Sequence, residues 1–246
     1  MDDSRLAFVN LGRKGFTMYQ IKDGFRFGTD TVLLAWFVSC YIRDAKNVRC
    51  LELGSNCGAA TLLTAARKDN AVIDSLEIDE EAVEVLGMNI ASNNLEDMVH
   101  AYHGDVRDLP GDIRQKQYDI VFMNPPFYKE GTGPSSNVTG RSEINGTLED
   151  FISSGSSRLI PSSGMMCVVM TARRTDELMS LMMKYQVKPM SMIAVHSDIS
   201  KNAEIVLVAG KKTNSFTQLE IMPPLVLNDK ERMNSIYEKE HTDCFI

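Results

Sequence analysis

Short apolar runs alternate with amphipathic stretches along this chain from about residue 48 onward. A short apolar run bounded by polar turns is typical of a buried strand, and apolar residues three or four positions apart indicate a helix that packs one face against a core. The predicted strands cover Val48–Leu53, Val72–Ile78, Val99–His103, Tyr118–Met123, Met165–Thr171, Met190–Val195 and Ile205–Ala209. The predicted helices cover Ala59–Ala66, Glu80–Asn93, Leu148–Leu159 and Asp176–Tyr185.

Repeated strand–helix units of this kind predict an α/β fold with one doubly wound, mostly parallel sheet of seven strands. The chain has 246 residues, which is enough for a single domain with a full core. We therefore expect one domain over residues 1–246, in which residues 1–47 form a short N-terminal extension and residues 48–246 form the core.

One long polar stretch, residues 129–147, interrupts the alternation and is rich in Gly, Ser, Thr and Asn. A loop of this length inside a compact domain is typical of a lid or a binding loop, and plain disorder is the alternative. Its single arginine, Arg141, is a candidate for contacting a phosphate group.

Composition limits the cellular setting. The acidic start, Met1-Asp2-Asp3-Ser4, differs from a signal or transit peptide, and no apolar run reaches the roughly 18 residues of a membrane helix. An odd number of cysteines without a C-x-x-C spacing or a secretion signal predicts free thiols in a reducing cytoplasm. The five are Cys40, Cys50, Cys57, Cys167 and Cys244. We expect no metal site, because no cysteine or further histidine lies near the pair His100 and His103.

The net charge of −7 and the isoelectric point of about 5.2 weakly disfavour a nucleic-acid partner, because phosphate contacts need Lys and Arg. A local basic patch can still exist on an acidic protein. Small basic pairs occur at Arg13-Lys14, Arg173-Arg174 and Lys211-Lys212, for which an ordinary solvated surface is the alternative reading.

The most specific motif is Asn124-Pro125-Pro126-Phe127, hereafter the hook, which directly follows a predicted strand. The prolines end the strand, so the motif predicts a stiff polar turn at the strand's carboxyl end, where open α/β sheets bind ligands. The Asn124 side chain and the Pro125 carbonyl are two fixed acceptors, which suit a planar NH2 group on a flat ring or an amide. Bonding both N–H groups would aim the nitrogen lone pair at an electrophile without a strong base, and Phe127 could stack on a base. A rigid turn without chemistry is the alternative.

A glycine-rich turn, Glu52-Leu53-Gly54-Ser55-Asn56-Cys57-Gly58, follows the first predicted strand of the core. Such a turn between a strand and a helix suits a nucleotide-like ligand, because its backbone N–H groups can approach closely. The pattern differs from the dinucleotide motif G-x-G-x-x-G at Asn56. Asn tolerates the left-handed conformation better than other non-glycine residues, so the turn remains feasible.

Acidic residues mark the ends of the next two strands. Glu77 follows Gly54 at close to the spacing of about 20 residues at which a carboxylate binds ribose hydroxyls, as in sites for NAD or for S-adenosylmethionine. Asp105 is a candidate acceptor for an adenine amino group. The hook favours S-adenosylmethionine, because hydride transfer has no use for two acceptors and a ring after the fourth strand. Helix capping is the alternative role for both acids.

With these motifs in order, the chain resembles the class I S-adenosylmethionine-dependent methyltransferases that carry N-P-P-[FY] and act on planar amino groups. Three further segments resemble the tRNA (adenine-N6) methyltransferases that modify valine tRNA at the adenine immediately 3′ of the anticodon. These segments are Gly24–Leu34, Lys201–Leu207 and Met222–Leu227, and the similarity spans about residues 12–240.

This resemblance implies a Rossmann-like class I methyltransferase fold, S-adenosylmethionine as the cofactor and tRNA as the partner. It places Gly54 and Gly58 around the methionine part of the cofactor, Glu77 on the ribose and Asp105 near the adenine. It assigns the target amino group to Asn124 and Pro125 and the target base to Phe127. Further implied cofactor contacts are Thr29, Asp30, Glu52, Asn56 and Asn124, and further implied substrate contacts are Arg26, Pro126 and Arg141.

Other classes share parts of this pattern. Protein glutamine N5-methyltransferases use a similar hook but carry a helical N-terminal domain, whereas 47 residues precede the first predicted core strand here. Ribosomal RNA guanine-N2 methyltransferases with this hook often have a duplicated N-terminal half, and DNA adenine methyltransferases usually add a target-recognition domain. A degenerate fold that binds RNA or a protein is the non-enzymatic alternative. We expect methyl transfer to adenine N6 in tRNA, by a cytoplasmic monomer.

Overall fold

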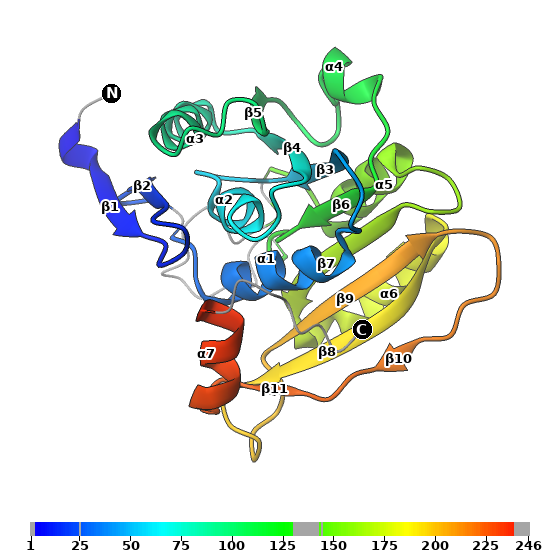
Figure 1. The fold of residues 1–246 in the computed structure, drawn as a ribbon. Helices are drawn as coiled ribbons and strands as arrows, with labels where there is room; N and C mark the ends of the chain where they lie inside the picture. The colour runs from blue at the N-terminus through cyan, green and yellow to red at the C-terminus, as the bar shows by residue number, and fades with distance from the viewer. Residues whose placement is uncertain (1–2, 25, 130–142, 144, 239–246) are drawn as a thin grey trace.

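A large mixed sheet forms the middle of the molecule, and a separate hairpin lies beside it (Figure 1). The computed structural model describes residues 3–24, 26–129, 143 and 145–238. In spatial order, the strands of the large sheet are β10 (Glu220–Ile221), β8 (Val187–His196), β9 (Ile205–Lys212), β7 (Met165–Thr171), β6 (Ile120–Met123), β3 (Val48–Leu53), β4 (Ala71–Glu77) and β5 (Val99–His103). A further short strand, β11 (Leu225–Val226), also pairs with β8.

The long strands of this sheet are the seven that the sequence predicts, and the doubly wound, mostly parallel arrangement is confirmed. Strand β9 runs antiparallel to both β7 and β8, whereas β3, β4, β5, β6 and β7 pair in parallel. Strands β10 and β11 add two residues each along β8.

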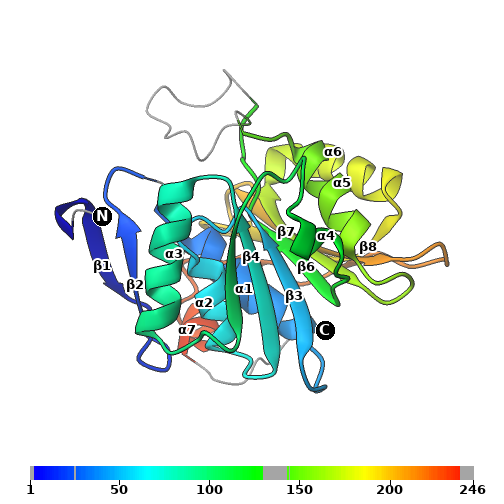
Figure 2. The same ribbon diagram turned by 90° about the horizontal axis from the view of Figure 1, so that it is seen from above.

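Helices cover both faces of the sheet (Figure 2). Along each strand, successive side chains point to opposite faces, so Cys50 and Phe122 join an apolar cluster with α1, α2 and α3, while Leu51 and Val121 join a second cluster with α5 and α6. The helices are α1 (Thr29–Tyr41), α2 (Ala59–Ala65), α3 (Glu80–Ser92), α4 (Gly111–Arg114), α5 (Leu148–Arg158), α6 (Thr175–Lys184) and α7 (Lys230–Glu238), with 3₁₀ turns η1 (Asp3–Arg5) and η3 (Ala172–Arg174).

The first 47 residues contribute elements that the hydrophobic pattern did not predict. Helix α1 is apolar on all sides, and its side chains from Leu33 to Val38 are buried between the sheet, α2 and α7. A helix that is buried on all sides lacks the alternation of apolar and polar faces from which a helix can be predicted. Strands β1 (Leu6–Asn10) and β2 (Thr17–Ile21) form the separate antiparallel hairpin.

The buried side chain of Asn89 on α3 ties this hairpin to the glycine-rich turn. Its Oδ1 accepts from the backbone N–H of Tyr19 at 2.7 Å, and its Nδ2 donates to the carbonyl oxygens of Tyr19 and Cys57, both at 2.9 Å. Each polar atom of a buried amide needs a partner, so these bonds fix β2 against the turn.

The cysteines differ in part from expectation. Cys50, Cys57 and Cys167 are buried free thiols, but Cys40 is disulfide-bonded, so the prediction of free thiols is wrong for Cys40. Cysteine count and spacing do not reveal which side chains the fold brings within bonding distance. Within the described residues, no helix has the length and apolar content to cross a membrane, and no group of three or more His, Cys, Asp or Glu could hold a metal ion.

Candidate active site

The hook and the glycine-rich turn lie at the ends of two neighbouring strands. The chain passes from β3 to β4 and β5 on one side and then returns to β6 on the other side of β3. Leu53 pairs in register with Met123, so Gly54 and Asn124 follow directly from paired residues. A change of strand order of this kind opens a crevice beyond the carboxyl ends of the strands, where α/β proteins bind ligands.

A pocket of about 970 Å³, including space open to solvent, lies at this crevice. The predicted site residues that line it are Glu52, Gly54, Asn56, Glu77, Asn124 and Pro126. Sequence reasoning did not predict several other residues that line the pocket. They are Met18 and Gln20 on β2, Phe27 just before α1, Thr31 on α1, Ala59 and Ala60 on α2, Asn145 just before α5, and Phe151 on α5. Phe27 and Thr31 belong to the Gly24–Leu34 segment, and the family resemblance of that segment was the one sequence signal that pointed to them.

The Asn124 side chain points to the α1 face of the sheet. Its Nδ2 donates to Oδ2 of Asp30 at 3.2 Å and to Oγ1 of Thr31 at 3.4 Å. Among the described residues, no donor reaches Oδ1 of Asn124 or the carbonyl oxygen of Pro125. The two acceptors that the hook predicts are therefore without protein partners in the described part of the chain.

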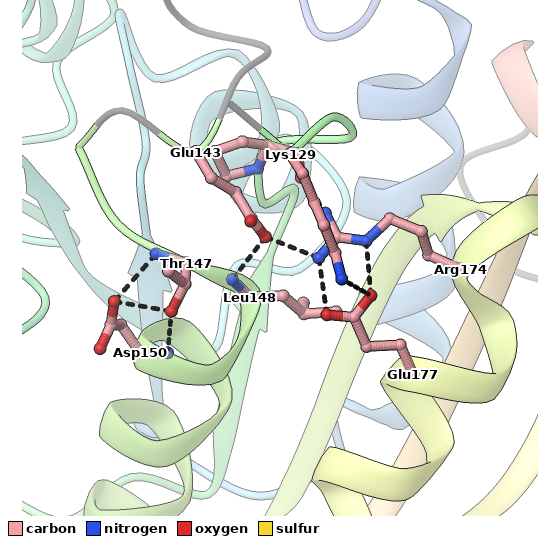
Figure 3. Close-up of polar contacts among 8 residues, drawn as sticks. Lys129, Glu143, Thr147, Leu148, Asp150, Arg174 and Glu177 are labelled. Atoms are coloured by element: carbon pink, nitrogen blue, oxygen red, sulfur yellow. Dashed lines mark hydrogen bonds and ion pairs between the residues drawn. The ribbon is translucent and has the colours of Figure 1, made fainter. Parts of the chain in front are cut away.

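Arg174 contacts the hook at Pro126, and its side chain points toward Glu143 and Glu177 (Figure 3). Its Nη1 donates to the carbonyl oxygen of Pro126 at 3.3 Å, and its Nη2 donates to Glu143 at 2.6 Å and to Glu177 at 3.0 Å. Oε1 of Glu143 also accepts from the backbone N–H of Leu148 at 2.8 Å. The Arg174 hydrogen bonds hold the pKa of Glu177 below its ordinary value. The sequence marked Arg174 only as a member of a basic pair.

The glycine-rich turn takes left-handed conformations at three positions. The φ angles are +74° at Gly54, +49° at Asn56 and +88° at Gly58. Asn56 thus takes the conformation that the sequence reasoning allowed it. Gly58 does not line the pocket; a Cβ there would lie 2.3 Å from Cδ1 of Leu86, so this glycine lets the start of α2 approach α3.

The carboxylate of Glu77 is buried at the pocket wall and accepts three backbone N–H groups. Oε2 accepts from Asn56 at 2.7 Å, and Oε1 accepts from Ile78 at 2.9 Å and from Asp79 at 3.0 Å. Burial raises the pKa of Glu77, and these hydrogen bonds oppose the rise. A carboxylate has about four acceptor positions, so Oε2 keeps one for a ligand hydroxyl.

Glu52 is the second acidic group of the pocket and is 3% exposed. Its Oε2 accepts from the hydroxyl of Thr61, which also bonds Ser75 at 2.6 Å. Burial raises the pKa of Glu52 to about 8, while the Thr61 bonds lower it and the nearby Glu77 raises it. A positive charge on a ligand would favour the ionised form of this group.

Asp105 does not line the pocket. Its two carboxylate oxygens bond the side chain of Arg107, at 2.9 and 3.0 Å from Nε, and this pair lowers the pKa of Asp105. Its neighbours Gly104 and Val106 do line the pocket. The Asp105 carboxylate is thus paired with Arg107, next to the pocket rather than in its wall.

Other predicted residues lie around the pocket rather than in it. Thr29 opens α1, and Arg26 is exposed and donates to the Lys22 carbonyl at 3.0 Å. Phe127 is half-buried against the second apolar cluster. Arg141 and most of the predicted loop lie outside the described residues.

The three basic pairs are not simple solvated surfaces. Arg13 and Arg174 are buried, and Arg13 donates to the carbonyl oxygen of Tyr237 at 2.9 Å. Nζ of Lys212 donates to Ser156 at 2.7 Å and to the Tyr185 carbonyl at 2.9 Å. At least one member of each pair therefore has a structural partner.

The strand order, the antiparallel β9, the helices on both faces and the pocket at the β3–β6 crevice define a Rossmann-like class I methyltransferase fold. Residues 31–197 match the family model described as the methyltransferase small domain, and the chain belongs to this family. A solved structure, described as a predicted O-methyltransferase, protein Atu636 from Agrobacterium tumefaciens, superimposes with a TM-score of 0.67 at 18% identity over 85% of this chain and 95% of that chain.

Curated relatives of this chain carry the name tRNA1(Val) (adenine(37)-N6)-methyltransferase, and two of them show the extent of the similarity. The one from Flavobacteriaceae bacterium (strain 3519-10) is 31% identical over 157 residues, which cover 63% of this chain and 64% of that protein. The match therefore spans slightly less than two thirds of that relative. The one from Flavobacterium psychrophilum is 24% identical over 93% of this chain and 94% of the relative.

Proposed function

We propose that this protein transfers a methyl group from S-adenosylmethionine to N6 of an adenine in tRNA. The observation that carries the proposal is a pair of acceptors at the hook, beside a pocket that contains Glu77. These acceptors, Oδ1 of Asn124 and the carbonyl oxygen of Pro125, have no donor among the described residues. The names of the relatives support adenine 37 of tRNA1(Val) as the target.

The pocket residues fit the proposed cofactor. The acceptor position left on Glu77 suits a ribose hydroxyl, and the apolar side chains of Leu76, Ile78 and Val106 suit the faces of an adenine ring. At Gly54, a Cβ would lie 3.1 Å from Phe151, so only a residue without one leaves the backbone open there. When bound, S-adenosylmethionine supplies an activated methyl group on a positively charged sulfur, a charge that Glu52 would favour.

The hook residues would act on the target amino group by position and polarity. An adenine amine is a poor nucleophile because its lone pair is delocalised into the ring. Oδ1 of Asn124 and the carbonyl of Pro125 would accept its two N–H groups and direct the lone pair into the pocket. Phe127 would stack on the base, which is worth roughly 1–3 kcal/mol. As N6 bonded the methyl carbon, the bond from that carbon to sulfur would break, S-adenosylhomocysteine would leave, and the extra proton on N6 would pass to water. No strongly basic side chain is required for this loss, because the methylated amino group carries a positive charge.

A tRNA anticodon loop suits the proposed substrate role. Its bases are unpaired and can be turned into a protein pocket without opening a duplex. The protein has a net charge of −7, and the charge of Arg174 is offset by its pairs with Glu143 and Glu177. We therefore expect binding to depend less steeply on salt than for a strongly basic RNA-binding protein.

Mass spectrometry of nucleosides tests the proposal. The purified protein is incubated with tRNA1(Val) and methyl-labelled S-adenosylmethionine, and the control is the same tRNA with guanine in place of adenine 37. We expect labelled N6-methyladenosine with the first tRNA and none with the second. Label on guanine, or on a glutamine of a protein substrate, would refute the adenine assignment.

The proposal extends to the working form of the protein. We propose that it acts as a monomer in the cytoplasm. Light scattering at two protein concentrations, with and without tRNA, tests the first part. A mass that stays at 27.5 kDa for the free protein supports a monomer, and twice that mass contradicts it.

A further inference from the structure

The carboxylate of Asp30 lies behind the hook, at the first turn of α1. Its Oδ2 is 3.2 Å from Nδ2 of Asn124, and its side chain does not line the pocket. Only 9% of Asp30 is exposed. The resemblance implies that Asp30 contacts the cofactor; in this structure its Oδ2 accepts from the side chain of Asn124.

The orientation of the Asn124 amide decides what the hook can bind. An amide has an oxygen that accepts and a nitrogen that donates, and a half-turn about the last side-chain bond exchanges them at almost no change in shape. With Oδ1 toward the pocket, Asn124 can accept from a target NH2 group. With Nδ2 toward the pocket, two donors would face each other and the hook would lose one of its acceptors.

A carboxylate selects between these orientations because its oxygens only accept hydrogen bonds. Facing Asp30, the amide must present Nδ2, since Oδ1 would meet another acceptor. The other partner of Nδ2, the Thr31 hydroxyl at 3.4 Å, can both donate and accept, so it tolerates either orientation. The orientation of the Asn124 amide therefore depends on Asp30.

Asp30 is itself held firmly. Its Oδ1 accepts from the backbone N–H of Thr31 at 2.9 Å, and a negative charge is favourable at the N-terminal turn of a helix. Gly28 leaves room for the carboxylate, because a Cβ there would lie 2.9 Å from Oδ1 of Asp30. The buried helix α1 thus holds the Asp30 carboxylate in a fixed position next to the Asn124 amide.

We propose that Asp30 is a positioning residue that fixes the amide of Asn124 with its oxygen toward the pocket. The inference rests on the proposed function, since it assumes that Asn124 accepts from the target amino group. Asp30 itself touches neither cofactor nor substrate in this role.

Kinetics of Asp30→Asn separate positioning from cofactor binding. The new amide can face Asn124 with either its oxygen or its nitrogen, so the orientation is no longer selected. We expect kcat to fall about ten- to a hundredfold, by analogy with the loss of a hydrogen-bond partner that orients a metal ligand. The KM for tRNA and the calorimetric Kd for S-adenosylmethionine should change less than twofold. Asp23→Asn is the control, because it removes an exposed carboxylate from the chain shortly before α1. It should leave kcat, the KM for tRNA and the Kd for S-adenosylmethionine unchanged.

An exchange of the two residues gives a readout that a purely structural role would not produce. Asn124→Asp alone places two carboxylates side by side and should also lower kcat at least tenfold. In the double variant Asp30→Asn/Asn124→Asp, the amide at position 30 can donate to one carboxylate oxygen and leave the other toward the pocket. We expect this variant to recover to within about tenfold of the original kcat.

Two results would overturn the proposal: a double variant no faster than the slower single variant, or a cofactor Kd raised more than tenfold in Asp30→Asn with kcat retained. If Asp30→Asn does not fold, Asp30→Glu takes its place. It keeps the acceptor-only group and should retain at least a third of the original kcat, and a loss above tenfold with normal folding would also count against the proposal. Failure of the proposed function is distinct, because it would appear as absence of N6-methyladenosine with the unmodified protein.

Discussion

The guanidinium of Arg174 donates to the carbonyl oxygen of Pro126 across 3.3 Å and so connects the end of β7 to the back of the hook. The same group is paired with Glu143 and Glu177, and its side chain is 10% exposed. The two carboxylates contact the guanidinium from different elements (Figure 3), and together with the Pro126 carbonyl they hold this buried charge in one position. The conformation of the hook is therefore stabilised by the hydrogen bond from Arg174 as well as by its two prolines.

Arg174→Gln should destabilise the protein and lower its activity. The substitution leaves the buried carboxylate of Glu143 without its cation, and we expect a loss of about 3 kcal/mol, the lower end for a broken buried pair because Glu177 is partly exposed. Urea unfolding measures this loss. Arg173→Gln is the matched control, since Arg173 is exposed, and it should change stability by less than about 0.5 kcal/mol. Equal effects of the two substitutions would contradict the supporting role of Arg174.

Asn124→Ala should separate turnover from cofactor binding. It removes one of the two acceptors for the target amine, and loss of one preorganised hydrogen-bonding group typically lowers kcat about 10²- to 10³-fold. Single-turnover incorporation of labelled methyl groups measures the rate, and calorimetry measures the Kd for S-adenosylmethionine. We expect the Kd to change less than threefold. A lost affinity for the cofactor at normal folding would instead place Asn124 mainly in the cofactor site.

Glu52 should make stability depend on pH. Its pKa of about 8 in the folded protein exceeds the ordinary value of 4.5, so between these values the folded state holds a proton that the unfolded state releases. The contribution of Glu52 to stability is therefore greatest below about pH 4.5 and declines as the pH rises toward 8. Glu52→Gln keeps an acceptor for Thr61 and should remove this decline. Urea unfolding of both proteins at about pH 5 and about pH 8 gives the comparison, and a difference that does not vary with pH would refute the assignment.

Gly58→Ala and Gly87→Ala should have opposite effects on stability. Gly58 has a φ of +88° and its new Cβ would meet Leu86 at 2.3 Å, so we expect a loss of about 1–3 kcal/mol. Gly87 is exposed inside α3 with nothing within 4 Å of a new Cβ, so alanine should add about 0.5–1 kcal/mol. Denaturant midpoints measure both changes. A stabilising Gly58→Ala would show that the approach of α2 to α3 does not require glycine.

The central strands β3, β4, β6 and β7 could be read from the sequence because nearly all of their residues are buried, on both faces of the sheet. The bounds predicted for β3, β5 and β7 agree with the structure, and those of β4 and α3 differ by one residue. Continuous apolar runs report this kind of burial directly. No comparable pattern predicted α1, whose apolar residues surround the whole helix, or the hairpin that carries Met18 and Gln20 to the pocket wall.

The candidate site divides in the same way. Sequence spacing led to Glu77 and Asn124, and both line one pocket because their strands end at the same edge of the sheet. The same reasoning predicted ligand-binding roles for both Glu77 and Asp105, although only Glu77 lines the pocket. Arg107, two residues along the chain, occupies the Asp105 carboxylate, whereas the donors to Glu77 are backbone groups that leave an acceptor position open.

By itself, the sequence determined the alternation of strands and helices, the stiffness of the hook and the left-handed positions of the glycine-rich turn. These follow from burial periodicity and from the torsions that Pro, Gly and Asn allow, which are local properties. Only the tertiary structure decided that Asp30, which is 94 positions from Asn124, faces its amide nitrogen, and that Arg174 supports Pro126. Hydrogen-bond partners distant in sequence meet because of strand order and helix packing, and no local pattern encodes that geometry.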